Sequence, residues 1–219
     1  VEPRTTEQVQ AAAKAAGDRL RAAVLLAAGT GMRRGEVFGL TEDRVLFLER
    51  KIIVDRQLVG IRQGGPVFGP PKTRASVREI PLPTSVAEAL AKHIEQYPPG
   101  PYGLLFTTSH GHAWRWTTLG EVWRTKMRAA KLEGFDFHEL RHYYASLLIR
   151  YGESIKTVQA RLGHKSAEET LNTYSHLWPD SDDRSRDAVD AALRAESGQD
   201  FGNFPDSQRT PNHRGHHLA

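Results

Sequence analysis

The sequence contains no cysteine among its 219 residues. Disulfides, thiolate zinc sites and thiol nucleophiles are therefore excluded, and the composition fits a reducing compartment. No apolar run reaches the roughly 18–20 residues that a bilayer-spanning helix needs. Residues 1–4 lack the apolar core of a secretory signal. These absences predict a soluble, cytoplasmic protein that does not associate with membranes.

The excess of positive charge is also small. The chain has 30 Lys and Arg against 26 Asp and Glu, a formal net charge of +4, and a sequence pI near 9.4. This balance permits an anionic partner without requiring one, so a nucleic-acid surface would have to arise from clustering of the basic residues. A composition of 39% hydrophobic and 26% charged residues is typical of a globular domain.

Hydrophobic periodicity predicts a mainly helical protein with a small antiparallel three-stranded β-sheet near its start. Pairs of residues three apart are expected to form capping boxes at helix starts, namely Thr5 with Gln8, Ser85 with Glu88, and Ser166 with Glu169. Helices are expected between Thr5 and Gly17 and at residues 19–28, 33–40, 85–97, 118–130, 138–151, 154–162, 167–174 and 182–195. Strands are expected at residues 45–48, 52–54 (continuing to 59) and 76–80, with residues 63–66 in a loop.

The helix that begins at His138 carries the first candidate site. Leu140, Tyr144, Leu147, Leu148 and Tyr151 are expected to form its buried stripe. His138 and Arg141 are three residues apart and project together along the edge of that stripe, where an imidazole and a guanidinium would grip an oxyanion. The plainer alternative is that His138 caps the helix and Arg141 pairs with Glu139 or Glu36.

Two further basic segments precede this helix. Arg33 and Arg34 open a helix, where the macrodipole favours an anion, and Glu36 lies one turn on to orient Arg33. Lys72 lies in a basic, polar loop that leads into a strand. Taken singly, each segment is also typical of an ordinary solvated helix or hairpin.

In series these segments resemble the catalytic domain of the tyrosine recombinases, the phage integrase family. The matching segments are Thr-Gly-Met-Arg-x-x-Glu ending at Glu36, the Lys72 hairpin, His138-x-x-Arg141-His142, Leu162-Gly163-His164, and Thr173-Tyr174-Ser175-His176. They occur in the family's order and span about residues 5–177. The resemblance implies the tyrosine recombinase fold for a catalytic domain at residues 1–178.

The resemblance assigns a role to each matching residue. Tyr174 would attack the scissile phosphate to form a 3′-phosphotyrosyl intermediate, which a partner 5′-hydroxyl then religates. Arg33 and Arg141 would hold the non-bridging oxygens, and Lys72 would protonate the leaving 5′-oxygen. His138 would be the proton acceptor or hydrogen-bond partner near the nucleophile.

The remaining roles are secondary. His164 would contact the phosphate, and Glu36 would support Arg33 from behind. Arg34, Arg74 and Arg78 are candidates for contacts with DNA phosphates, and His142 is expected to pack or hydrogen-bond structurally. The tail histidines are not expected to bind a metal; they are His213, His216 and His217.

The family chemistry needs no cofactor and no metal, because the arginines and Lys72 supply the positive charge that Mg²⁺ supplies in other phosphoryl transfers. The sequence has no Walker loop and no acidic cluster. The expected partner is double-stranded DNA carrying specific recombination sites, bound by a tetramer with accessory DNA-bending or directionality factors. The expected location is the cytoplasm of a bacterial host, with the nucleoid as the place of action.

The rest of the chain is expected to be accessory. Residues 179–196 would form a C-terminal helix that packs on a neighbouring protomer or on its own domain, and residues 197–219 a disordered tail. The N-terminal core-binding domain of the family is missing, which suggests a fragment. Integration or excision of a phage or mobile element is the expected role.

Three alternatives stay open at this point. A type IB topoisomerase would use the same nucleophile and cations to relax DNA. A DNA-binding relative would keep the fold without the reaction. A metal-dependent hydrolase would use His138, His142 and His164, although that set lacks the usual carboxylate partners.

Overall fold

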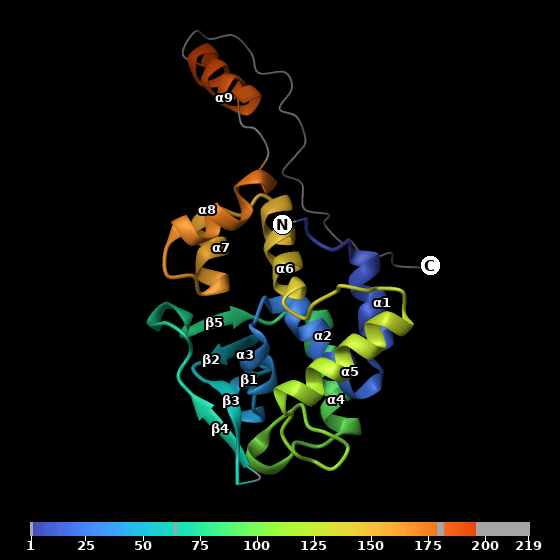
Figure 1. The fold of residues 1–219 in the computed structure, drawn as a ribbon. Helices are drawn as coiled ribbons and strands as arrows, with labels where there is room; N and C mark the ends of the chain where they lie inside the picture. Colours follow the sequence, from blue (N-terminus) through green and yellow to red (C-terminus); the bar gives the residue numbers. More distant parts are fainter. Residues whose placement is uncertain (1, 64, 179–181, 196–219) are drawn as a thin grey trace, which may run out of the picture. The chain divides into compact units, whose positions relative to one another are not determined.

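A computed structural model describes residues 2–63, 65–178 and 182–195 (Figure 1). The chain divides into two compact units, Val1–Trp178 and Pro179–Ala219.

The first unit is mainly helical, as the sequence predicts. Its α-helices are α1 (Thr6–Ala16), α2 (Asp18–Thr30), α3 (Arg34–Phe38), α4 (Thr84–Gln96), α5 (Trp116–Ala129), α6 (Glu139–Arg150), α7 (Ile155–Leu162) and α8 (Ala167–Tyr174). Short 3-10 helices are η1 (Glu42–Arg44), η2 (Arg74–Ser76), η3 (Pro101–Gly103) and η4 (Ser175–Leu177). The strands are β1 (Val45–Leu46), β2 (Lys51–Val54), β3 (Gln57–Arg62), β4 (Gly65–Gly69) and β5 (Arg78–Pro81).

Helix α2 is the centre of the helical core. It packs against α1, α4 and α6, and Figure 1 shows it enclosed among these helices. Its buried residues are mostly small, including Ala22, Ala23, Ala27 and Ala28. Small side chains let neighbouring helices approach closely while still removing apolar surface from water.

The expected three-stranded antiparallel sheet is present, in the order β1-β2-β5. Ile52 pairs with both Val45 and Ile80 across the sheet, and its side chain is fully buried. Strand β5 therefore lies beside β2 although a long connection separates them. That connection carries the segment with Lys72 to the edge where α7 packs on β5.

A second sheet was not apparent from the sequence. Strands β3 and β4 pair as an antiparallel hairpin between β2 and η2, where the sequence suggested a strand continuing to residue 59 and then a loop at 63–66. Glycines at 60, 65 and 69 and Pro66 obscure the strand pattern. Helix α3 packs against β3, and Leu58 of that strand is buried.

Two smaller predictions about helices are wrong. Helix α4 has Pro83 at its N-cap and no side-chain cap, so Ser85 and Glu88 form no capping box. Tyr151 is 83% exposed because α6 ends at Arg150, and the buried positions of the helix include Ala145 and Ile149 instead. The capping box of Thr5 and Gln8 is confirmed.

The second unit contains helix α9 (Asp182–Ala195). Val189 and Leu193 are exposed on it. The expected tail at 197–219, with its histidines, lies outside the described residues. Within the described parts of the chain, no helix is long and apolar enough to cross a membrane.

Gly163, which ends α7, provides a test of this packing. Its φ is +65°, and a Cβ there would lie 3.0 Å from the Cα of Ser76 and 3.1 Å from the Arg78 side chain. We expect Gly163→Ala to lower the thermal unfolding midpoint more than Gly152→Ala. Gly152 has a φ of +82°, but a Cβ at that position would have no neighbour within 4 Å, so its substitution adds only the backbone strain of about 1–2 kcal/mol. Equal losses of stability would contradict the close approach of α7 and η2.

Candidate active site

Tyr174 is the last residue of α8 and is only 1% exposed. It belongs to a small apolar cluster with residues of α6 and α7, among them Ala145, Val158 and Leu162. Burial raises the pKa of the Tyr174 hydroxyl to about 12. The phenol is therefore protonated at neutral pH and needs a hydrogen-bond partner inside the protein.

That partner is His142. The Nδ1 atom of His142 lies 2.7 Å from the Tyr174 hydroxyl oxygen. His138, one turn earlier on α6, packs edge-on against His142 with ring centroids 4.9 Å apart. Desolvation, the charge of His138 and the charge of Arg141 lower the pKa of His142 to about 4, so its ring is neutral near pH 7. The structure thus places His142, not His138, in contact with the tyrosine.

Arg141 links the C-terminal ends of two helices. Its Nη1 donates to the carbonyl of Gly31 at 2.6 Å, and its Nη2 donates to the carbonyl of Leu162 at 2.7 Å. Such carbonyls have no partner within their own helix and carry the negative end of its dipole. The backbone of Gly31 comes so close to α6 that a Cβ there would lie 2.4 Å from Tyr144.

These contacts argue against the plainer alternative, in which His138 caps α6 and Arg141 pairs with Glu139 or Glu36. Among the described residues Arg141 pairs with carbonyls, whereas Glu139 binds Arg4 at 2.8 Å. His138 occupies the N-cap without a side-chain cap bond. Burial and the charges of Arg33 and Arg78 lower the pKa of Arg141 to about 9, which leaves it cationic at neutral pH.

Glu36 is a buried carboxylate, 2% exposed, that binds two arginines. It accepts from Arg33 Nη1 at 3.1 Å and from the backbone amide of Arg33 at 2.8 Å. It also accepts from both Nη atoms of Arg78, at 3.2 and 2.9 Å. Burial alone would raise the pKa of Glu36, but Arg78 and Arg33 outweigh it and hold that pKa below the usual 4.5.

This arrangement corrects the sequence interpretation of Arg78. Its side chain is 6% exposed, and besides Glu36 it donates to the carbonyls of Arg161 and Ser76. It lies inside the site and ties β5 to α3 and α7, in place of the surface DNA contact that the sequence suggested. The sequence offered one signal for this role, since Arg78 follows the Lys72 loop at the start of a strand.

Ser76 was not identified from the sequence as a site residue. Its hydroxyl accepts from Arg33 Nη1 at 3.1 Å and donates to the carbonyl of Gly163 at 3.2 Å. Arg33 Nη2 also approaches that carbonyl, at 3.4 Å. Arg33 is therefore positioned by α3, by η2 and by the end of α7 together. No sequence pattern marks a single serine for such a role.

His164 lies on the other side of the tyrosine. Its ring is nearly parallel to that of Tyr174, at 10°, with centroids 6.5 Å apart, and its Nδ1 lies 2.8 Å from the hydroxyl of Thr170. Burial and the charge of Arg141 lower its pKa to about 4. A neutral His164 next to the arginines can offer a hydrogen bond without adding to their charge.

Lys72, Arg34 and Arg74 are exposed. Lys72 makes no hydrogen bond or ion pair with the part of the chain that the structure describes, so the structure does not join it to the other site residues. The Arg34 guanidinium lies over the ring of Trp116, 5.0 Å from its centre.

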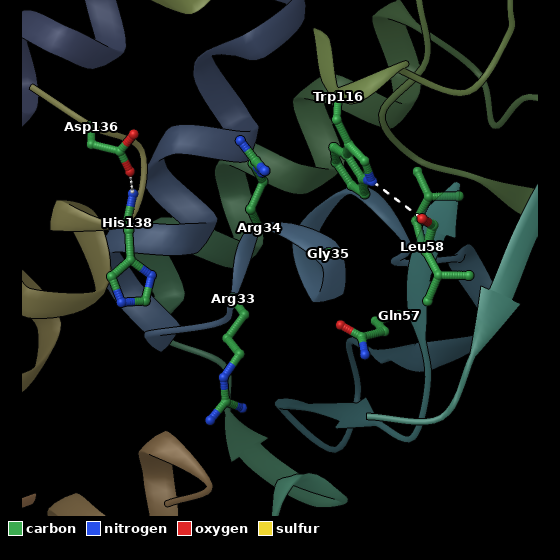
Figure 2. Close-up of a pocket in the computed structure, with 9 residues that line it drawn as sticks. Arg33, Arg34, Gly35, Gln57, Leu58, Trp116, Asp136 and His138 are labelled. Carbon is green, nitrogen blue, oxygen red and sulfur yellow. Dashed lines mark hydrogen bonds between the residues drawn. The ribbon is translucent and has the colours of Figure 1, made fainter. Parts of the chain in front are cut away.

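An open pocket of about 540 Å³ lies next to Arg33. Figure 2 shows His138 on one side of it and Trp116 on the other, with Arg33 and Arg34 between them. The pocket is lined by Arg33, Arg34, Gly35, Gln57, Leu58, Val59, Trp116, Asp136 and His138. It provides a recess that is lined by two arginines and has one aromatic wall.

The side chains of this site are better suited to bind an anion than a metal cation. The described residues contain no group of three or more His, Asp or Glu side chains placed to hold a metal ion. In contrast, the charges of Arg33 and Arg78 act on Arg141, which also interacts with Tyr174, and Glu36 binds both Arg33 and Arg78. An excess of positive charge in a partly desolvated site attracts a phosphate strongly.

The phage integrase family model matches residues 3–180, and the chain belongs to this family of tyrosine recombinases, a class of DNA breaking-rejoining enzymes. A tyrosine recombinase XerC-like protein of Caldanaerobacter subterraneus subsp. tengcongensis is 32% identical over 74% of this chain and 47% of its own length. A putative prophage phiRv2 integrase of Mycobacterium tuberculosis is 30% identical over 88% of the chain and 50% of its own length. The chain thus spans about half the length of the curated relatives it matches.

Solved structures agree on the fold. The Tn1549 transposon integrase in complex with circular intermediate DNA matches with a TM-score of 0.69 and 25% identity, over 88% of this chain and 67% of that one. The catalytic domain of bacteriophage HP1 integrase matches with a TM-score of 0.59 and 20% identity, over 91% of this chain and 99% of that domain. The fold class predicted from the sequence is confirmed.

The buried Glu36 predicts a pH-dependent stability. Its folded pKa is depressed, so its contribution is fully present above its ordinary pKa of 4.5 and is lost as the pH falls through the folded value. At pH 7 we expect Glu36→Gln to cost about 3 kcal/mol of unfolding free energy, because two buried arginines lose their counter-charge. Denaturant unfolding of both proteins between pH 7 and pH 3 should show the difference narrowing below about pH 4.5. A pH-independent difference would mean that the carboxylate charge is not what the arginines need.

Proposed function

We propose that this chain carries the catalytic centre of a site-specific DNA recombinase that integrates or excises a phage or another mobile element. The observation that supports this most directly is the Tyr174 hydroxyl, which lies 2.7 Å from His142 Nδ1 and interacts with the charge of Arg141, on which the charge of Arg33 also acts. A nucleophile next to an excess of fixed guanidiniums suits attack on a phosphodiester. Relatives named as integrases from a prophage, a phage and other mobile elements support the biological role.

The proposed reaction has two balanced steps. Tyr174 Oη attacks the scissile phosphorus, its proton leaves toward the imidazoles of α6, and the P–O5′ bond breaks to leave a 3′-phosphotyrosyl link. Lys72 supplies the proton that the departing 5′-oxygen takes up. A 5′-hydroxyl from a partner strand then attacks the same phosphorus and returns its proton to Lys72, while the P–O bond to Tyr174 breaks and the phenol oxygen takes its proton back from the imidazoles. The ester bond count is conserved in each step, so no ATP is consumed.

Arg33 and Arg141 would hold the two non-bridging oxygens, whose negative charge grows in the transition state. Both guanidiniums are already fixed by backbone carbonyls, so little reorganisation accompanies the reaction. His138 is the residue that the resemblance assigns as proton acceptor or hydrogen-bond partner near the nucleophile. His164 would add a contact with the phosphate, and Glu36 would keep Arg33 in place. Lys72 is exposed and would have to approach the phosphate when DNA binds.

Double-stranded DNA with specific recombination sites is the proposed partner. The pocket beside Arg33 supports this, because Arg34 is exposed at its edge, and Arg74 is exposed near the Lys72 loop. The Tn1549 integrase structure contains DNA. By the same family resemblance we propose a tetramer on DNA, accessory bending or directionality factors, α9 as a contact between protomers, and action at the nucleoid in the host cytoplasm.

The nucleophile is tested with a nicked suicide DNA substrate that carries candidate core sites. We expect the 219-residue chain to form a protein–DNA adduct that survives denaturant, in EDTA, and Tyr174→Phe to form none. Denaturing gel electrophoresis with labelled DNA measures the adduct. An adduct that persists in Tyr174→Phe would refute the assignment. An adduct accompanied by relaxation without strand exchange would favour a topoisomerase-like reaction.

The guanidinium geometry is tested with Arg33→Lys. Lysine keeps the charge but cannot donate the planar pair of hydrogen bonds, so we expect single-turnover cleavage to slow by roughly 10²-fold. Arg150→Lys is the matched control, because Arg150 is exposed at the end of α6, away from these contacts. Cleavage by Arg33→Lys at the rate of the control would contradict the proposed role.

A further inference from the structure

The contact between His142 and Tyr174 is not explained by the roles that the family resemblance assigns. The resemblance assigns His138 as the proton acceptor or hydrogen-bond partner near the nucleophile and His164 as a phosphate contact, whereas His142 was expected to be structural. Yet the hydroxyl of Tyr174 has His142 as its partner, with 2.7 Å between Nδ1 and Oη. The two residues are 32 positions apart and lie on different helices, α6 and α8.

From this geometry we infer that His142 is the positioning residue for the nucleophile: its Nδ1 accepts the hydrogen bond of the Tyr174 hydroxyl and aims the phenol oxygen for attack. The inference rests on the proposed function and names the partner that the hydroxyl uses. It moves the contact with the nucleophile from His138 to His142.

Neighbouring rings hold the His142 ring in an orientation in which Nδ1 can accept the hydrogen bond of the Tyr174 hydroxyl. On one side its ring packs edge-on against His138, at 90° and 4.9 Å. On the other it meets the Tyr174 ring at 62°, with centroids 5.6 Å apart. Because rings on both sides restrict its rotation, Nδ1 keeps pointing at the hydroxyl.

The charge state of His142 agrees with an acceptor role. Burial, His138 and Arg141 lower its pKa, while Glu139 raises it by a smaller amount. The neutral ring has one free lone pair, and with the proton on Nε2 that lone pair is on Nδ1. An imidazolium would have no lone pair and would offer a proton to the phenol oxygen instead.

Tyr174 itself needs such a restraint. Its ring is buried among apolar side chains of α6 and α7, and the His164 ring lies nearly parallel to it, at 10° with centroids 6.5 Å apart. These contacts restrict the ring, but they do not set the direction of the O–H bond. The hydrogen bond to His142 sets the direction of the O–H bond. It points the proton away from the oxygen lone pair that would attack phosphorus.

The experiment measures single-turnover adduct formation on the suicide substrate with saturating protein, for the wild type and three His142 variants. His142→Phe keeps a flat ring of similar size without an acceptor. His142→Asn places an amide oxygen near the position of Nδ1, and His142→Gln places it farther out, near that of Nε2. Substrate binding and thermal unfolding are measured for each protein.

We expect His142→Phe to bind DNA as tightly as the wild type but to cleave roughly 10- to 100-fold more slowly, within the range of a lost acid–base or positioning contact. His142→Asn should recover most of the rate and His142→Gln should not. A structural role alone predicts that rate follows thermal stability across the variants, without selective rescue by asparagine. Cleavage by His142→Phe at the wild-type rate would overturn the inference.

A second measurement needs no DNA. In protein labelled with ¹⁵N at histidine, NMR should show His142 as the Nε2–H tautomer, and Tyr174→Phe should shift its Nδ1 resonance. An unchanged resonance, or a protonated Nδ1, would overturn the inference even if cleavage were normal. Conversely, a correct NMR result without any wild-type adduct would count against the proposed function and leave the hydrogen bond established.

Discussion

The site depends on three guanidiniums held close together in a partly buried space. Like charges repel strongly where little water screens them, and burial together with the charges of Arg33 and Arg78 accordingly lowers the pKa of Arg141. Two features offset the repulsion. The carboxylate of Glu36 binds Arg33 and Arg78, and backbone carbonyls at the ends of α2 and α7 accept from Arg141. The remaining positive charge is what an anionic substrate would neutralise.

The interactions that hold the site together also stabilise the ends of the helices around it. The carbonyls that bind Arg141 are those that helix geometry leaves without partners, so capping two helices and fixing one arginine are the same interaction. Gly31 and Gly163 end these helices in left-handed conformations and allow the close approach of Tyr144 and of η2. A site built in this way is preorganised, because its donors are oriented before a substrate arrives.

The tyrosine is kept in a different kind of environment. Its ring belongs to an apolar cluster, and its hydroxyl meets a neutral imidazole. The phenol therefore stays protonated, although the charge of Arg141 favours the phenolate. Tyr174 and the arginines, which we propose as the nucleophile and the phosphate-binding groups, therefore occupy separate environments with no ion pair between them. The exposed Lys72 is the part of the proposed machinery that this structure leaves outside the cluster.

The sequence by itself determined the mainly helical class, the three-stranded sheet and the family, because periodicity, caps and ordered motifs are local signals. It also identified Arg33, Glu36, Arg141 and Tyr174 as residues of one site. Only the tertiary structure decided that His142 meets Tyr174, that Arg78 turns inward to Glu36, and that β3 and β4 pair. These contacts join residues far apart in the chain, or strands with weak patterns, and they depend on how helices pack against one another. The way in which two helices pack against each other produces no periodic pattern in the sequence.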